Sequence, residues 1–284
     1  MSLAGLGAST SGQKRLLPGF RLTLGFTLVY LSLVVLIPLS ALALRPWEAG
    51  PQAVFEVLTS ERVLAALRLS FGAAALAAAV NGVMGLLVAW VLVRHDFPGK
   101  RLIDAFIDLP FALPTAVAGI ALTALYAPNG PIGELLMSMG VKVAYTPIGI
   151  VIALIFVGFP FVVRTVQPVL EDIDAGAEEA AATLGATPLQ RVRLVVLPAL
   201  RSALVTGVGL SFARAVGEYG SVIFIAGNLP LKSEIAPLLI VVKLEEYDYA
   251  AAAAIGLAML CLSFVILLAS NLLQRLIATP GAGR

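Results

Sequence analysis

Charge is scarce in this sequence. Only 13% of the 284 residues are charged, 60% are hydrophobic, and the formal net charge is +2. A soluble domain averages about 25% charged and roughly 45–50% apolar residues. The small net charge, with no block of Lys and Arg, argues against nucleic acid as a partner. The apolar excess, with a mean hydropathy of +0.98, favours a chain surrounded by membrane lipid.

Cysteine and histidine are nearly absent as well. The chain has one cysteine, Cys261, and one histidine, His95. A single cysteine excludes an intramolecular disulfide framework, and one Cys with one His is a poor basis for a metal cluster. We therefore expect no metal site, and we expect Cys261 to serve as a small hydrophobic side chain in its apolar run.

Nucleotide-binding and catalytic patterns are also missing. A phosphate-binding loop would read G-x-x-x-x-G-K-[ST], whereas the sole Gly-Lys pair, Gly99-Lys100, is followed by Arg101. An intramembrane enzyme would need a nucleophile with a base, a carboxylate pair or a metal triad at membrane depth. The sequence offers none of these sets, so we expect a chain that is not an enzyme and binds no cofactor.

Six apolar stretches are long enough, or nearly so, to form a transmembrane helix, which takes about 20 residues. They cover residues 22–44, 69–93, 102–126, 147–163, 203–226 and 250–273. The first is longer than the ~7–15-residue core of a cleaved signal peptide, so we expect a retained anchor. The sequence thus predicts an all-α transmembrane domain over residues 22–274, preceded by a segment of residues 1–21 and followed by a tail of residues 275–284.

The placement of Lys and Arg predicts the orientation. With the N-terminus inside, the inner segments hold about twice as many Lys and Arg residues as the outer ones, which is the bias of cytoplasmic loops. Both termini are therefore expected in the cytoplasm. Between the first two stretches, residues 52–68 show a helical apolar period and predict an amphipathic helix at the outer surface.

The longest inner connection, residues 164–202, has the local chemistry of two short helices. Asp174 is suited to cap the first helix, and Gly185 to end it in a left-handed conformation. Thr187 is suited to cap the second helix, which is expected to end near Pro198 because proline disfavours helix at the residue before it. The result is a rigid protrusion on the cytoplasmic face.

This connection resembles the "EAA" loop of ABC importer permeases. The matching positions are Glu179, Ala180, Ala181, Gly185, Val195, Leu197 and Pro198. The family prefers Ile at the position of Val195, which is a conservative change. The resemblance implies the six-helix fold of a type I importer permease, with the loop seated as a coupling helix in a groove of a separate ATP-binding subunit. ATP would then act only through that partner.

Further segments resemble the sulfate and molybdate permeases. Residues 212–228 resemble both kinds of permease. Residues 108–119 and 231–250 look most like the sulfate/thiosulfate T-type subunit. The resemblance implies a multi-pass subunit of the bacterial cytoplasmic (inner) membrane. It also implies a homologous W-type permease, two ATP-binding subunits and an external sulfate-binding protein as partners. A molybdate or tungstate permease, and a secondary transporter without an ATPase, remain the alternatives.

Two features inside the apolar stretches stand out. Arg214 and Glu218 are four residues apart, and charges at membrane depth cost at least ~2.5–3.5 kcal/mol each, so they normally face a bundle interior or water. Arg214 could line a pathway and favour an anion while Glu218 holds it, or the two could form a structural ion pair. In the third stretch, Pro110 and Pro114 predict a kink.

Overall fold

The computed structural model describes residues 20–277, and every regular element in this range is helical. The chain divides into two units, residues 1–44 and residues 45–284. The predicted N-terminal segment and C-terminal tail lie mostly outside the described residues. The all-α fold predicted from the sequence is confirmed for the part that the structure describes.

The first unit is one helical stretch. It consists of α1 (Phe20–Leu31), a π-helical turn η1 (Ser32–Leu36) and α2 (Ile37–Leu44). Its large apolar side chains are exposed, among them Leu22 and Phe26. A helix that carries one charge, Arg21 at its start, and is otherwise mostly apolar suits a lipid environment, because the backbone hydrogen bonds along it are made internally.

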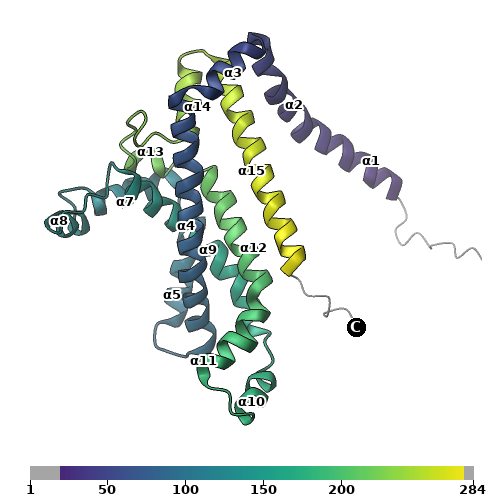
Figure 1. Cartoon of the computed structure of the whole chain (residues 1–284), viewed down its shortest axis with the longest axis vertical. Coiled ribbons are helices and arrows are strands. Elements are labelled where there is room, and N and C mark those ends of the chain that lie inside the picture. Colours follow the sequence, from purple (N-terminus) through teal and green to yellow (C-terminus); the bar gives the residue numbers. More distant parts are fainter. Residues whose placement is uncertain (1–19, 278–284) are drawn as a thin grey trace, which may run out of the picture. The chain divides into compact units, whose positions relative to one another are not determined.

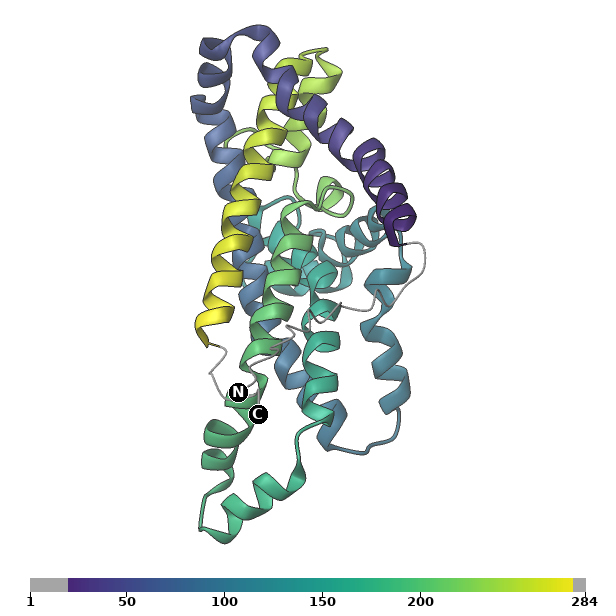
Figure 2. The ribbon, with the colours of Figure 1, turned by 90° about the vertical axis from the view of Figure 1, so that its right-hand side faces the viewer.

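The second unit is built around three long helices. In chain order its elements are η2 (Arg45–Ala49), α3 (Pro51–Thr59), α4 (Glu61–Arg94), α5 (Lys100–Ile107), α6 (Leu109–Ala112), α7 (Thr115–Tyr126), α8 (Pro131–Ser138), α9 (Pro147–Glu171), α10 (Ala175–Thr183), α11 (Pro188–Arg191), η3 (Val192–Val196), α12 (Leu197–Val216), α13 (Val222–Ile225), α14 (Ala236–Glu245) and α15 (Tyr249–Ile277). Helices α4, α9 and α12 pack on one another at its centre. Within this unit, α3 and α14 lie at one end and α10 and α11 at the other (Figures 1 and 2).

Glycine allows the three central helices to approach closely. A Cβ atom at Gly85 of α4 would lie 2.8 Å from Val162 of α9, and one at Gly82 would lie 2.8 Å from Val208 of α12. Small residues at helix contacts are the usual way to bring membrane helices together, since lipid supplies no hydrophobic force between them.

A buried polar contact joins the same three helices. Asn81 of α4 is fully buried, and its Nδ2 donates to the Ser211 hydroxyl of α12 (3.0 Å) and to the Ile155 carbonyl of α9 (3.2 Å). A Cβ atom at Gly158 would lie 2.4 Å from the Ser211 oxygen. The lack of a side chain at Gly158 thus leaves room for this contact, which fixes the three helices in one register.

The third predicted span is not one helix. It is divided into α5, α6 and α7, with Leu113 extended (φ −84°, ψ 135°) before Pro114. The residue before a proline is driven out of helical geometry, so the predicted kink is a full break. Among residues 20–277, five helices are long and apolar enough to cross a membrane. The count of six spans therefore stays a prediction.

Three other predicted boundaries were wrong. The predicted fifth span continues to residue 226, but α12 ends at Val216 and α13 is a separate short helix. The predicted helix over residues 52–68 is divided at Ser60, whose extended backbone (ψ 140°) separates α3 from α4. Finally, α9 runs on to Glu171, through residues expected in the inner connection. The helix ends follow local backbone chemistry, which apolar patterning does not report.

Candidate functional site

The predicted coupling loop forms a protrusion at one end of the second unit (Figures 1 and 2). We call α10, the following turn and α11, residues 175–191, the knob. Its first helix begins where the sequence predicted, because the Asp174 carboxylate accepts a hydrogen bond from the Gly176 N–H (2.9 Å). This cap satisfies one of the free N–H groups at the helix start.

The knob turns at Gly185, as predicted. Gly185 has φ +85°, its N–H donates to the Ala182 carbonyl, and the Ala186 N–H donates to the Ala181 carbonyl, both at 3.0 Å. These two bonds close the end of α10 in a Schellman motif. A Cβ atom at Gly185 would meet nothing within 4 Å. Glycine is therefore required here by its backbone conformation rather than by lack of space.

The second helix of the knob starts with the predicted cap at Thr187. Thr187 Oγ1 accepts from the Gln190 N–H (3.3 Å), and Gln190 Oε1 accepts from the Thr187 N–H (2.8 Å). This reciprocal capping box satisfies two free donors at the helix start. The knob thus has a fixed cap at the beginning of each of its helices.

The prediction that this second helix ends near Pro198 was wrong. A helix of 29 residues runs from Pro188 to Val216. Near Pro198 the hydrogen bonding widens to a π-helical turn, η3, in which the Leu197 N–H bonds the Val192 carbonyl. The wider turn accommodates a residue that lacks an N–H and carries a ring. The knob is therefore joined to α12 by continuous helix.

The residues of the EAA-like pattern fall into two groups. Glu179, Ala180 and Gly185 are exposed on the knob, whereas Ala181, Val195, Leu197 and Pro198 are half-buried. Beside the last three, Val196 and Leu200 are fully buried in a core cluster with side chains of α4 and α9. The pattern therefore combines an accessible tip with a base that is anchored in the helix bundle.

Exposed leucines lie on the knob and in η3 just after it. Leu184, Leu189 and Leu194 are 88%, 76% and 68% exposed. Neighbouring exposed apolar side chains on a polar protrusion are typical of a protein contact surface.

An ion pair between Arg94 and Glu178 connects the knob to α4. Arg94 is the last residue of α4, and Glu178 lies in the first turn of α10. The sequence placed both residues on the cytoplasmic side but gave no sign that they pair, because they are 84 positions apart.

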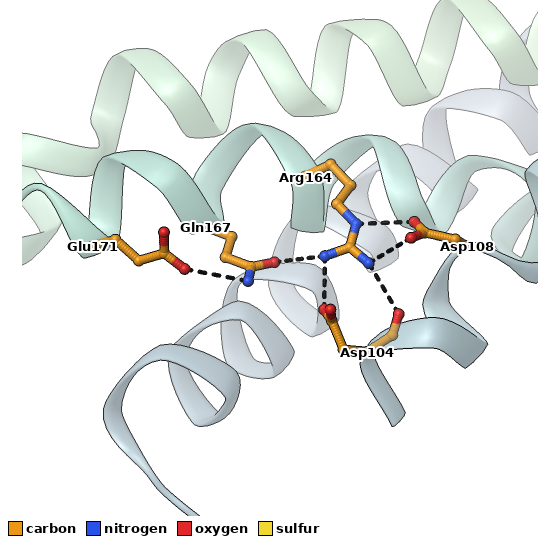
Figure 3. Close-up of polar contacts among 5 residues, drawn as sticks. All are labelled: Asp104, Asp108, Arg164, Gln167 and Glu171. Carbon is orange, nitrogen blue, oxygen red and sulfur yellow. Dashed lines mark hydrogen bonds and ion pairs between the residues drawn. The ribbon is translucent and has the colours of Figure 1, made fainter. Parts of the chain in front are cut away.

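A second polar cluster joins the broken third span to α9 (Figure 3). Arg164 donates through Nε and Nη2 to the Asp108 carboxylate (2.9 and 2.7 Å), and through Nη1 to Asp104 Oδ1 (2.7 Å). Gln167 also accepts from Arg164 (2.8 Å) and donates to Glu171 (3.3 Å). Asp108 lies at the junction of α5 and α6. A bidentate guanidinium–carboxylate contact thus fixes that junction, which sequence spacing alone did not reveal.

The predicted charged pair is present at the end of α12. Arg214 Nη1 lies 2.5 Å from Glu218 Oε2, although Glu218 follows the end of the helix and is not part of its face. The Glu218 side chain is 2% exposed, and its Oε1 accepts from the N–H and the hydroxyl of Ser221, both at 2.9 Å. The Arg214 side chain is 33% exposed. Glu218 is thus a fixed acceptor that holds a partly accessible guanidinium.

Comparison with known proteins identifies the family. Residues 81–279 match the family described as "Binding-protein-dependent transport system inner membrane component". The "Sulfate transport system permease protein CysT" of Salmonella typhimurium is 51% identical over 262 residues, which cover 92% of this chain and 95% of that protein. The protein of that name from Synechocystis is 46% identical and covers 88% of this chain and 87% of its own length.

Solved structures agree at the level of the fold. A bacterial ABC transporter involved in the import of the acidic polysaccharide alginate matches with a TM-score of 0.75 at 17% identity, over 92% of this chain and 96% of that chain. The alginate transporter in complex with a periplasmic protein matches with a TM-score of 0.76 at 17% identity, over 92% and 95%. The chain belongs to the binding-protein-dependent transport system inner membrane components, the permeases of ABC importers.

Proposed function

We propose that this chain is the non-catalytic permease subunit of an ATP-driven sulfate importer. The observation that carries the proposal is the 51% identity, over 92% of the chain, to a protein named as a sulfate transport permease. The relatives described above give no support to the molybdate or tungstate alternative. Transport, in this account, is movement of a dianion through the bundle without covalent chemistry in this chain.

The knob is the proposed seat of a separate ATP-binding subunit. Its exposed leucines offer apolar contact area, and the accessible Glu179, Ala180 and Gly185 lie on the same protrusion. Rigid caps at Asp174 and Thr187 keep the knob from absorbing a displacement by unwinding. The continuous helix of residues 188–216 supports a direct transfer of that displacement into α12.

The full complex would contain further subunits. We expect a homologous W-type permease, two ATP-binding subunits and an external sulfate-binding protein, which would dock at the end opposite the knob. ATP binding would draw the knobs together and open the pathway outward, and hydrolysis would reset it. In this alternating-access cycle, a partner can drive the change only if it binds one of the two permease conformations more tightly than the other.

Arg214 is the proposed contact with the anion. Its guanidinium is partly accessible, whereas its partner Glu218 is buried and already occupied by Arg214 and Ser221. A buried carboxylate that contacts Arg214 through Oε2 and accepts from Ser221 through Oε1 is suited to hold the guanidinium in one orientation. Arg214 would then favour passage of a dianion.

Uptake of radiolabelled sulfate tests the proposed substrate. Cells that lack this subunit should lose saturable sulfate uptake, and expression of the chain should restore it in the presence of excess molybdate. Loss of molybdate uptake alone would contradict the sulfate assignment. Co-purification tests the energy source: a bound ATPase that is released by mutation of the knob supports the importer, whereas transport by the chain without an ATPase would favour a secondary transporter.

A further inference from the structure

Helix α10 of the knob has few attachments to the rest of the molecule. None of its nine residues is buried. Its main backbone neighbours are α11 and η3, and residues 172–174 link it along the chain to α9. The helix is therefore free to pivot about this short link and the Gly185 turn unless a side chain restrains it.

The Arg94–Glu178 ion pair is such a restraint, and a helix dipole stabilises the charge of each of its two residues. Arg94 stands at the C-terminal end of α4, where the helix dipole favours positive charge, and Glu178 stands in the first turn of α10, where the dipole favours negative charge. The guanidinium also lies 5.6 Å from the centre of the Trp90 ring, a distance at which the ring attracts a cation.

The pair is also better shielded from water than an ordinary surface salt bridge. The side chains of Arg94 and Glu178 are 26% and 20% exposed. Exposed pairs contribute little because solvent and salt screen them, whereas partly buried charges are screened less. The contact can therefore resist displacement of α10 relative to α4.

Helix α4 is well placed to carry such a displacement onward. It has 34 residues and packs along both α9 and α12. Near its other end, Arg62 donates through Nε and Nη2 to the buried Glu234 carboxylate (2.8 and 2.7 Å), just before α14. One helix thus carries an ion pair at each end, one to the knob and one to the opposite side of the unit.

We propose that the Arg94–Glu178 pair is a strut through which movement of the knob reaches α4. The inference rests on the proposed function, because it assumes that an ATPase displaces the knob. The knob has a helical connection to α12, whose base packs on α4, and a short chain link to α9, whereas this side-chain contact joins α10 itself directly to α4. Without the strut, α10 pivots, and part of the displacement is lost within the loop.

The test measures sulfate uptake per ATP hydrolysed by the complete complex in proteoliposomes. Glu178→Ala removes the strut and keeps a good helix former in α10. We expect uptake per ATP to fall by between about two- and thirtyfold, the range that corresponds to ~0.5–2 kcal/mol of lost coupling. The amount of bound ATPase is measured in the same preparations, because Glu178 lies within the proposed ATPase seat, and the fall in uptake per ATP should exceed any loss of ATPase. Asp172→Ala removes an exposed acid of the same loop and should behave like the unmodified complex.

A charge exchange separates a strut from a general effect on folding. The double variant Arg94→Glu/Glu178→Arg should recover more uptake per ATP than Arg94→Glu alone, although less than the unmodified chain, because both dipoles then oppose the pair. If Glu178→Ala does not assemble, this comparison decides the question. A double variant no better than Arg94→Glu would overturn the proposal.

Two other results would overturn it. In one, Glu178→Ala keeps the original uptake per ATP. In the other, uptake falls only in proportion to lost ATPase, so that the pair merely shapes the docking surface. Failure of the proposed function is a separate outcome: the unmodified complex would then take up no sulfate when supplied with ATP.

Discussion

Replacement of Gly185 by valine should disconnect the knob from its ATPase. Gly185 has φ +85°, a conformation that costs an ordinary L-residue roughly 1–2 kcal/mol and a β-branched residue more. If the backbone leaves that conformation instead, the two hydrogen bonds donated by the Gly185 and Ala186 N–H groups are lost, each worth about 0.5–1.5 kcal/mol. Because the chain takes the cheaper of these two routes, the local cost is about 1–3 kcal/mol. An exposed nine-residue helix, which is marginal by itself, would lose its last turn.

The damage should stay within the knob. A Cβ atom at Gly185 meets nothing within 4 Å, and the residue is exposed, so the packed helices are not disturbed. We expect Gly185→Val to insert into the membrane in normal amounts and to melt at the temperature of the unmodified permease. ATPase association should weaken, and sulfate uptake should be abolished. Affinity capture of the ATPase with uptake in the same preparations measures both effects.

Gly140→Val is a matched control. Gly140 has φ +78°, has nothing within 4 Å of its Cβ position, and ends α8 with a similar pair of hydrogen bonds, from Gly140 to Met137 and from Val141 to Leu136. The backbone cost is comparable, but the residue lies outside the knob. ATPase association should survive in this variant. Normal uptake by Gly185→Val, or an equal loss of ATPase from both variants, would refute the reasoning.

Three other substitutions test separate parts of the structure. Arg214→Ala should abolish sulfate uptake while the complex elutes intact from a sizing column; failure to assemble would favour a structural ion pair instead. Arg164→Met should lower the melting temperature of the detergent-solubilised permease by several degrees, because it removes about 1–3 kcal/mol of charged hydrogen bonding; an unchanged temperature would contradict the role of the cluster. Gly158→Val should deplete folded protein from the membrane, because its Cβ atom would lie 2.4 Å from the Ser211 hydroxyl, whereas Gly72→Ala, with open space around it, should not.

Features fixed by neighbouring residues could be predicted from the sequence. The caps at Asp174 and Thr187 and the turn at Gly185 each depend on a few adjacent backbone groups, and the structure has them where the pattern indicated. The apolar stretches likewise indicated the long helices α4, α9, α12 and α15. Their ends were less well predicted, because hydropathy continues past Val216 although the helix does not.

Features that depend on packing could not be predicted. Two prolines in the third span allowed either a kink or a break. The Arg164 contacts that fix the α5–α6 junction join Asp104 and Asp108 across 56 to 60 positions. The partnership of Arg94 with Glu178 likewise requires the last turn of α4 and the first turn of α10 to lie side by side. Charge pairs between distant segments leave no periodic signal, so spacing within the sequence cannot reveal them.

ATP-dependent sulfate uptake by the reconstituted complex tests the central claim most directly. The complex of this chain with its partner permease, ATPase and external binding protein would be placed in liposomes, and labelled sulfate would be followed with ATP or a non-hydrolysable analogue on the knob side. The account predicts accumulation with ATP and none with the analogue. Accumulation that proceeds equally without hydrolysis, or with the ATPase left out, would contradict it.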